Sequence, residues 1–326
     1  DGLDIGASLY IYYREECVVY LYSDWKDTQT KKQSYTSDTI QLVFSTSKRI
    51  LATVIALCVK RGWLDYDALI AEYWSEFASS GKQNITIGDL LLYRAGLSFI
   101  DKQLTVEDIY NGSRMASLVD AQKPHCQPKT AHEYHGHIIG YAAGELIRRV
   151  DLHHRTYNQF VRDELDREFY VSILHDEVEA RVSPVTRKEV DTSNVFSMDS
   201  QTQKKSLSCS DASPLESSLM IFNGTRLHCV AIPSVNEITN ARSLARIYYL
   251  LIGDINEYGK KQKRLLSEQT LIEATKNVTP TDEPDRNWYN MSTNFGKGRF
   301  QIYSDCFNIF GDGVFSHSDI ILDLYL

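Results

Sequence analysis

Strand-like segments lie near both ends of this 326-residue chain, and helix-like segments fill most of the stretch between them. Residues 7–13 and 17–22 are rich in Tyr, Val, Ile and Leu and flank a short polar turn, which predicts a β-hairpin. Residues 299–303, 307–310 and 320–326 carry similar signals at the other end. This order predicts an α/β (α+β) fold, in which an antiparallel sheet is assembled from both termini and a helical region is inserted into it.

Five segments between the ends show the apolar spacing of amphipathic or buried helices. They are residues 85–92, 105–118, 140–150, 157–170 and 240–252. We find no internal repeats, so a solenoid or propeller is not indicated.

A length of 326 residues allows one large domain or two interleaved domains, and we expect a single domain over residues 1–326. Its α/β part covers 1–80 and 230–326, and its helical part covers 81–185. Residues 187–217 are dense in Ser, Thr, Asp, Lys and Gln, which predicts a polar surface insertion outside the core.

Bulk properties exclude several classes of function. The formal net charge of −8 argues against a nucleic-acid partner, because neutralising phosphates requires a basic face. The longest apolar run, residues 50–59, is too short for a transmembrane segment. The six cysteines are widely scattered without a C-x-x-C pair, so neither a zinc cluster nor a thioredoxin-type site is expected. We expect no metal and no cofactor.

Localisation stays open at this stage. The chain starts at Asp1 without methionine and stops at Leu326 inside a strand-like run, so we interpret both ends as trimmed and leave room for a signal or transit peptide. The N-x-S/T tripeptides permit a secretory origin without proving it, and a mitochondrial location stays open as an alternative. They begin at Asn84, Asn111, Asn223, Asn277 and Asn290. The oligomeric state is likewise left open.

Ser45 and Lys48 form the most informative chemical pattern. An apolar helix is predicted through residues 49–62, and Ser45 is expected at its N-terminus or just inside it. Residues three apart share a helix face, so the Lys48 amine can reach the Ser45 hydroxyl. A serine needs a nearby base to attack a carbonyl, and a desolvated lysine can supply it. The helix N-terminus adds partial positive charge where an oxyanion would form. The structural alternative is that Ser45 caps the helix and Lys48 is solvated.

Several motifs in the same order resemble those of β-lactamase-related serine hydrolases, the superfamily of class C β-lactamases, DD-peptidases and family VIII carboxylesterases (peptidase family S12). The matching segments are F-S-T-S-K at 44–48, K-R-G-W-L-D at 60–65, I-T-I-G-D-L-L-L-Y-R-A-G-L at 85–97 and N-E-I-T-N-A-R-S-L-A-R at 236–246. The last segment is similar to the animal or esterase-like branch. The resemblance implies the β-lactamase/transpeptidase-like fold and the S-x-x-K nucleophile motif.

The family's second motif, Y-x-N, is placed at Tyr134-His135-Gly136. The resemblance implies that Tyr134 is the phenolic partner of Ser45 and Lys48, and that Gly136 lies on the substrate side. A tyrosine acts as a base only when a cation lowers its pKa, and Lys48 is the natural candidate.

The third motif, K-T-G or H-x-G, falls at Gly311-Asp312-Gly313 and departs from the family pattern. Its basic residue, which would meet a substrate carboxylate, is replaced by Gly311. Gly313 would still let the strand approach the substrate. By resemblance, the oxyanion hole would use the N–H groups of Ser45 and Val314.

These observations predict a serine hydrolase of the esterase, peptidase or β-lactamase type. It would form an acyl-Ser45 intermediate with a small-molecule or peptide acyl substrate. The missing basic residue weakens β-lactams and C-terminal D-alanine peptides as substrates, relative to neutral esters or internal peptide bonds. The alternative is an inactive pseudoenzyme that kept the fold as a binding or scaffolding domain.

Other polar clusters have structural interpretations. A metal site from His132, His135 and His137 is an open alternative, but H-E-x-x-H would need histidine at Gly136. His153-His154 lies at a predicted helix end and is interpreted as structural. Glu107 and Asp108 form no glycosidase pair.

Overall fold

The computed structural model describes most of the chain. The described residues are 6–27, 29–186, 219–257, 259–280, 283–286, 294–302 and 315–316. The predicted surface insertion at 187–217 and the strand-like segments at 307–310 and 320–326 lie outside them.

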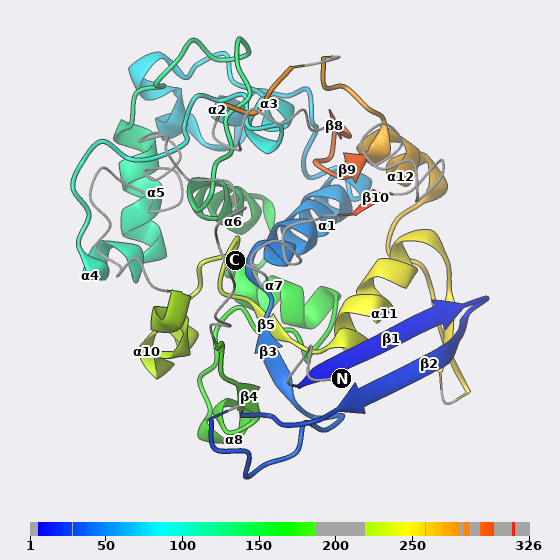
Figure 1. The fold of residues 1–326 in the computed structure, drawn as a ribbon. Helices are drawn as coiled ribbons and strands as arrows, with labels where there is room; N and C mark the ends of the chain where they lie inside the picture. Colours follow the sequence, from blue (N-terminus) through cyan, green and yellow to red (C-terminus); the bar gives the residue numbers. More distant parts are fainter. Residues whose placement is uncertain are drawn as a thin grey trace.

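Helix α1 (Ser47–Lys60) runs through the centre of the molecule (Figure 1). Every residue from 47 to 58 is buried, as expected for a helix that is apolar on all sides. Ser45 was predicted at the start of this helix or just inside it. It lies instead in a 3₁₀ turn, η1 (Phe44–Thr46), directly before α1.

The N-terminal hairpin is confirmed, with β1 (Ala7–Tyr13) antiparallel to β2 (Glu16–Ser23). It packs against α11 (Ala241–Ile252), where the Tyr12 and Tyr249 ring centroids are 5.4 Å apart. Figure 1 shows the hairpin along this helix at the edge of the molecule.

A small mixed sheet leads directly into the Ser45 turn. Its central strand β3 (Ile40–Leu42) pairs in parallel with β4 (Val182–Ser183) and antiparallel with β5 (Ile238–Thr239). Segments that are about 200 residues apart in sequence therefore meet beside the nucleophile motif.

Three short C-terminal strands form an antiparallel sheet in the order β10 (Phe315–Ser316), β9 (Gln301–Ile302), β8 (Asn294–Phe295). The third motif lies outside the described residues, immediately before β10. Within the part of the chain that the structure describes, these strands do not pair with β1 or β2. The single sheet from both termini is therefore not seen there.

Helices α2 to α6 gather on one side of α1 (Figure 1). The helical region comprises α2 (Ile70–Tyr73), η2 (Ser75–Gly81), α3 (Ile87–Leu91), α4 (Val106–Ile109), α5 (Gly112–Ala121), α6 (Ile138–Val150) and α7 (Tyr157–Glu164). The single helix predicted for 105–118 is wrong, because the Asn111 side chain accepts a hydrogen bond from Arg114 N and starts α5 as a separate helix. The helix predicted for 157–170 ends at Glu164, and Tyr170 instead bridges Ile238 of β5.

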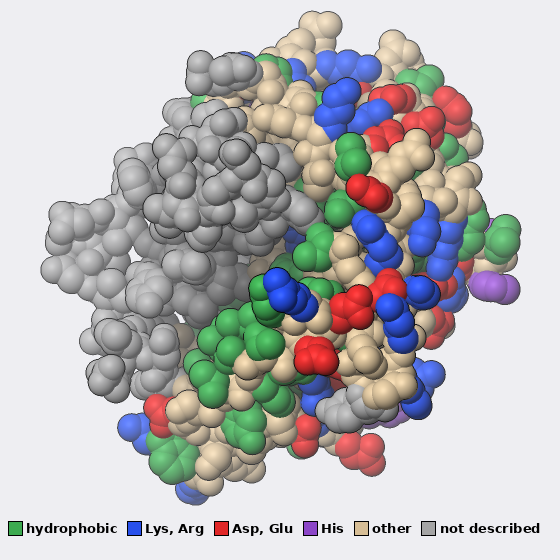
Figure 2. Space-filling view, turned by 90° about the vertical axis from the view of Figure 1, so that its right-hand side faces the viewer, with side chains coloured by type: hydrophobic (Ala, Val, Ile, Leu, Met, Phe, Trp, Pro, Cys, Tyr) green, Lys and Arg blue, Asp and Glu red, His purple; other side chains and the backbone are tan. Residues whose placement is uncertain are grey.

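The remaining elements connect this core. They are α8 (Asp176–Glu179), η4 (Leu219–Asn223), α10 (Thr225–His228), β6 (Ile255–Glu257), β7 (Lys260–Gln262) and α12 (Glu268–Thr275). None of the helices in the described ranges has the length and apolar character to span a membrane. On the face drawn in Figure 2, basic and acidic side chains are interspersed rather than gathered by sign.

Candidate active site

Two side chains converge on the Ser45 hydroxyl. Lys48 Nζ donates a hydrogen bond to Ser45 Oγ at 2.8 Å, and the Tyr134 hydroxyl lies 2.9 Å from the same oxygen. Lys48 is 1% exposed and Tyr134 is 7% exposed, so both polar groups are held away from bulk water. The structure thus brings together three residues that span 89 positions of sequence.

The turn that presents Ser45 is built by the end of β3. Val43 N donates to Glu237 O at 2.9 Å, and Thr46 N donates back to Val43 O at 3.0 Å. Phe44 adopts a φ of 41°, a left-handed conformation that is costly for a bulky residue. Its buried ring packs edge-on against Phe222, with centroids 5.6 Å apart. This packing helps to maintain the strained backbone of Phe44 in the turn that carries Ser45.

Lys48 is oriented by a second acceptor. Its Nζ donates to Ser234 O at 2.9 Å and lies 4.9 Å from the centre of the Tyr134 ring. The Ser234 loop can approach this closely because it lies against Gly140, where a Cβ atom would come within 2.7 Å of Ser234 Oγ. A glycine on α6 is therefore part of the arrangement that holds the lysine.

Tyr134 is held through its backbone. Tyr134 N donates to Asp285 Oδ1 at 3.1 Å, and the preceding Glu133 N donates to Tyr93 O at 3.0 Å. The Tyr93 and Tyr134 rings lie 5.0 Å apart.

Two neighbouring histidines, His132 and His135, are buried. Burial lowers the pKa of His132 to about 3, so its 3.4 Å contact with Asp285 is not a charged pair. Burial also lowers the pKa of His135 to about 4. His135 Nε2 accepts from Leu97 N at 3.1 Å, and its Nδ1 donates to Glu133 O. Because both nitrogens of His135 serve the backbone, the cluster is poorly suited to ligate a metal.

The remaining candidate residues from the sequence lie outside the Ser45 cluster or outside the described residues. Gly136 is buried in the turn between Tyr134 and α6. Gly311, Gly313 and Val314 lie outside the described residues. Asp108 caps α4 and pairs with Arg114, while Glu107 pairs with Arg226. His153 and His154 are exposed beyond the end of α6.

Sequence reasoning missed a buried acid beside the site. Glu237 is fully buried, and burial raises the pKa of its carboxyl well above the usual range. The hydroxyls of Ser47 and Tyr157 oppose this rise, as does the charge of Lys48. Within the described structure, neither carboxyl oxygen has a hydrogen-bond partner in good geometry. Glu237 lies inside the matched segment 236–246, but nothing in that pattern indicates burial.

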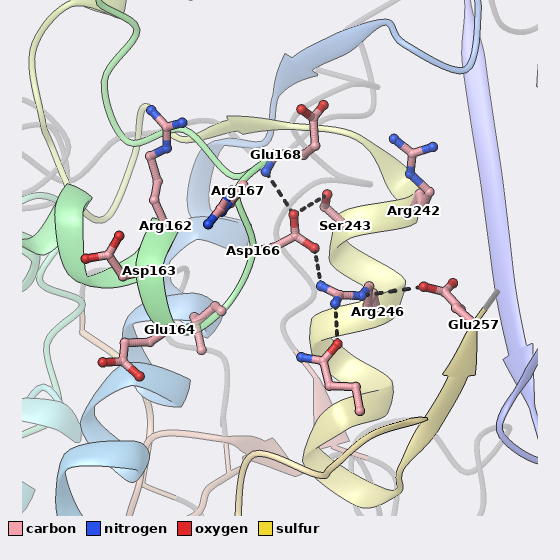
Figure 3. A pocket seen from close by; sticks show the side chains of 12 residues that line it. Arg162, Asp163, Glu164, Asp166, Arg167, Glu168, Arg242, Ser243, Arg246 and Glu257 are labelled. Carbon is pink, nitrogen blue, oxygen red and sulfur yellow. Dashed lines mark hydrogen bonds and ion pairs between the residues drawn. The ribbon is translucent and has the colours of Figure 1, made fainter. Parts of the chain in front are cut away.

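A separate surface cavity lies between the end of α7 and α11 (Figure 3). It has a volume of about 470 Å³ and is lined mainly by charged side chains of both signs. At its centre Arg246 pairs with Asp166 at 2.7 Å and with Glu257 at 3.6 Å. None of Ser45, Lys48 and Tyr134 lines this cavity.

Comparison with known proteins adds sequence relatives. The model of the family described as Beta-lactamase matches residues 2–301. A stretch of 146 residues, 44% of this chain, is 32% identical to "Esterase/beta-lactamase LipL" of Mycobacterium tuberculosis (strain ATCC 25618 / H37Rv). That stretch spans 33% of LipL, so the match covers about a third of the relative's length.

Solved structures resemble the whole described fold. A family VIII carboxylesterase superposes with a TM-score of 0.78 at 25% sequence identity. The superposition covers 92% of this chain and 77% of the carboxylesterase chain. EstA from Arthrobacter nitroguajacolicus Rue61a gives 0.77 at 25% identity, with coverages of 92% and 76%. A penicillin-binding protein homologue from Caulobacter crescentus gives 0.76 at 25% identity, with coverages of 98% and 82%.

Proposed function

Because the chain belongs to the beta-lactamase family, we propose that it is a serine hydrolase whose Ser45 hydroxyl forms a covalent ester with its acyl substrate. One observation carries this proposal: the Lys48 amine and the Tyr134 hydroxyl both lie within hydrogen-bond distance of Ser45 Oγ, at 2.8 and 2.9 Å. Nucleophile and base within such a distance of each other form the usual signature of an activated serine.

The proposed reaction has two steps. In the first, Ser45 Oγ attacks the substrate carbonyl, its proton passes to the Lys48–Tyr134 unit, and that unit returns the proton to the departing alcohol or amine. In the second, a water molecule gives up a proton to the same unit and attacks the acyl ester. The bond between the acyl carbon and Ser45 Oγ then breaks, the unit returns the proton to Oγ, and the acid leaves. The oxyanion would be met by the N–H groups of Ser45 and Val314, and by the positive end of α1.

The proposed substrates are neutral acyl groups, esters first. LipL is named as an esterase and β-lactamase, and two of the structural neighbours are named as a carboxylesterase and as EstA. At the third motif, Gly311 supplies no cation for a substrate carboxylate, and Asp312 adds negative charge. Both features favour neutral esters over β-lactams or peptides with a free C-terminal carboxylate.

The proposal is tested by covalent labelling. A fluorophosphonate probe should add once per chain, on the peptide that contains Ser45, and Ser45→Ala should abolish both the adduct and the hydrolysis of p-nitrophenyl butyrate. A chain that neither labels nor turns over would favour the pseudoenzyme alternative, which the altered third motif supports. Undiminished labelling of Ser45→Ala would remove Ser45 from the mechanism.

A further inference from the structure

Two buried, non-glycine residues with left-handed backbones meet beside the catalytic groups. Tyr93 has a φ of 59° and Arg299 a φ of 70°, and both are at most 1% exposed. The Arg299 guanidinium carbon lies 4.5 Å from the centre of the Tyr93 ring. Side chains are kept at such backbone positions only where the surrounding structure maintains them, and such positions cluster at functional sites.

Tyr93 supports the segment that carries Tyr134. Its ring lies 5.0 Å from the Tyr134 ring and stacks at 5.7 Å on His132, while its carbonyl accepts the hydrogen bond from Glu133 N. A displacement of Tyr93 would therefore be transmitted to the tyrosine that contacts Ser45.

Arg299 supports the first turn of the nucleophile helix. Its Nη1 donates to Lys48 O at 3.0 Å. Arg299 lies in the tight turn between β8 and β9, closed by a bond from its own N to Gly296 O at 2.7 Å. That turn presses against α12, since a Cβ atom at Gly296 would lie 2.5 Å from Ala274 O. Strand β9 pairs with β10, the strand directly after the third motif.

We propose that Arg299, stacked on Tyr93, is a positioning residue for the reaction. Its guanidinium ties the backbone of Lys48 to the C-terminal sheet, and through the Tyr93 ring it supports the Tyr134 segment. One side chain thus fixes the positions of both Lys48 and Tyr134 relative to Ser45. This inference rests on the proposed function, because it concerns the geometry of that same site.

The test compares two arginines that share a backbone conformation. Arg14 has a φ of 50°, is exposed in the turn between β1 and β2, and lies 5.1 Å from the Tyr13 ring. Glycine suits both positions, so Arg299→Gly and Arg14→Gly should each fold without backbone strain. Arg299→Lys keeps the positive charge but loses the planar guanidinium.

With p-nitrophenyl butyrate, Arg299→Gly should lower kcat about 10–100-fold per labelled active site and leave KM within about twofold, because small misplacements of catalytic groups reduce the chemical step. Arg299→Lys should recover part of this loss, and Arg14→Gly should match the wild type. By mass spectrometry, amide hydrogen exchange in residues 47–52 and 132–136 should accelerate in Arg299→Gly alone.

Three outcomes overturn the inference. The first is wild-type kcat in Arg299→Gly, the second is unchanged exchange in both segments, and the third is a loss of activity that disappears when kcat is expressed per labelled site. Failure of the proposed function looks different, because the wild type itself would then neither label nor turn over. The exchange measurement would still decide whether Arg299 holds the two segments.

Discussion

Ionisable side chains beside the start of α1 and in the cavity between α7 and α11 have opposite surroundings. In the cavity, Arg246 is a quarter exposed and pairs with Asp166 and Glu257 (Figure 3). At the α1 site, Lys48 and Glu237 are at most 1% exposed, and neither carboxyl oxygen of the acid has a hydrogen-bond partner in good geometry within the described structure.

This difference distinguishes ion pairs that support the fold from ionisable groups that can take part in proton transfer. Ion pairs that are partly exposed contribute little and are screened by solvent. A buried acid beside a buried amine instead changes its proton affinity, which is common where groups exchange protons. The charges relevant to function are therefore expected at the α1 site, although the surface cavity holds more charged residues.

The largest effect should come from the groups around Ser45. Lys48→Ala, Tyr134→Phe and the double variant should each lower kcat/KM for p-nitrophenyl butyrate by about 10³-fold or more. The loss in the double variant should be close to that in each single variant, because the effects of groups that act as one unit are non-additive. Steady-state kinetics on all three variants provide the check. A Tyr134→Phe protein with wild-type turnover would remove Tyr134 from the unit.

The next largest effect is expected when a cation is added at Gly311 in the third motif. Gly311→His or Gly311→Lys should raise kcat/KM on carboxylate-bearing substrates such as cephalosporins about 10–100-fold more than on neutral esters. A charge-assisted hydrogen bond contributes roughly 1.5–3 kcal/mol. Parallel assays with both substrate classes measure the ratio. Rapid cephalosporin hydrolysis by the wild type would show that another cation already fills this role.

Glu237 should make the stability of the fold depend on pH. Below the usual pKa of a glutamic acid, near 4.3, both the folded and the unfolded chains keep the proton. Above it, the unfolded chain releases a proton that burial retains in the folded chain, so stability falls as the pH rises.

Glu237→Gln removes that proton exchange. The variant should unfold like the wild type at pH 4 and be more stable than the wild type at pH 8, because the glutamine cannot release a proton in the unfolded chain. Urea unfolding across this pH range measures it. A constant difference between the two proteins at every pH would mean that Glu237 does not retain a proton.

The smallest effect is expected in the surface cavity. Arg246→Gln breaks the pairs with Asp166 and Glu257 and should cost about 1 kcal/mol or less, with kcat unchanged. Thermal unfolding and ester hydrolysis together provide the check. A tenfold loss of kcat in a folded Arg246→Gln protein would contradict the division between the two regions.

Much of the local structure followed from the sequence. The hairpin at the N-terminus and the buried helix after Ser45 were predictable because alternation and all-round apolarity are local patterns. Helix ends were less predictable. One predicted helix is divided at Asn111, and another stops at Glu164, because a cap and a bridge to a distant strand outweigh apolar spacing.

The sequence by itself predicted which groups could react: the three-residue spacing of Ser45 and Lys48 indicated a pair, and resemblance to a known family suggested Tyr134. Only the tertiary structure decided what surrounds them. No local sequence pattern indicates the roles of Glu237, Tyr93 and Arg299. The residue types Glu, Tyr and Arg predict neither burial nor a left-handed backbone. Their environments come from contacts between segments far apart in the chain, as when Arg299 reaches the Lys48 carbonyl across 251 positions.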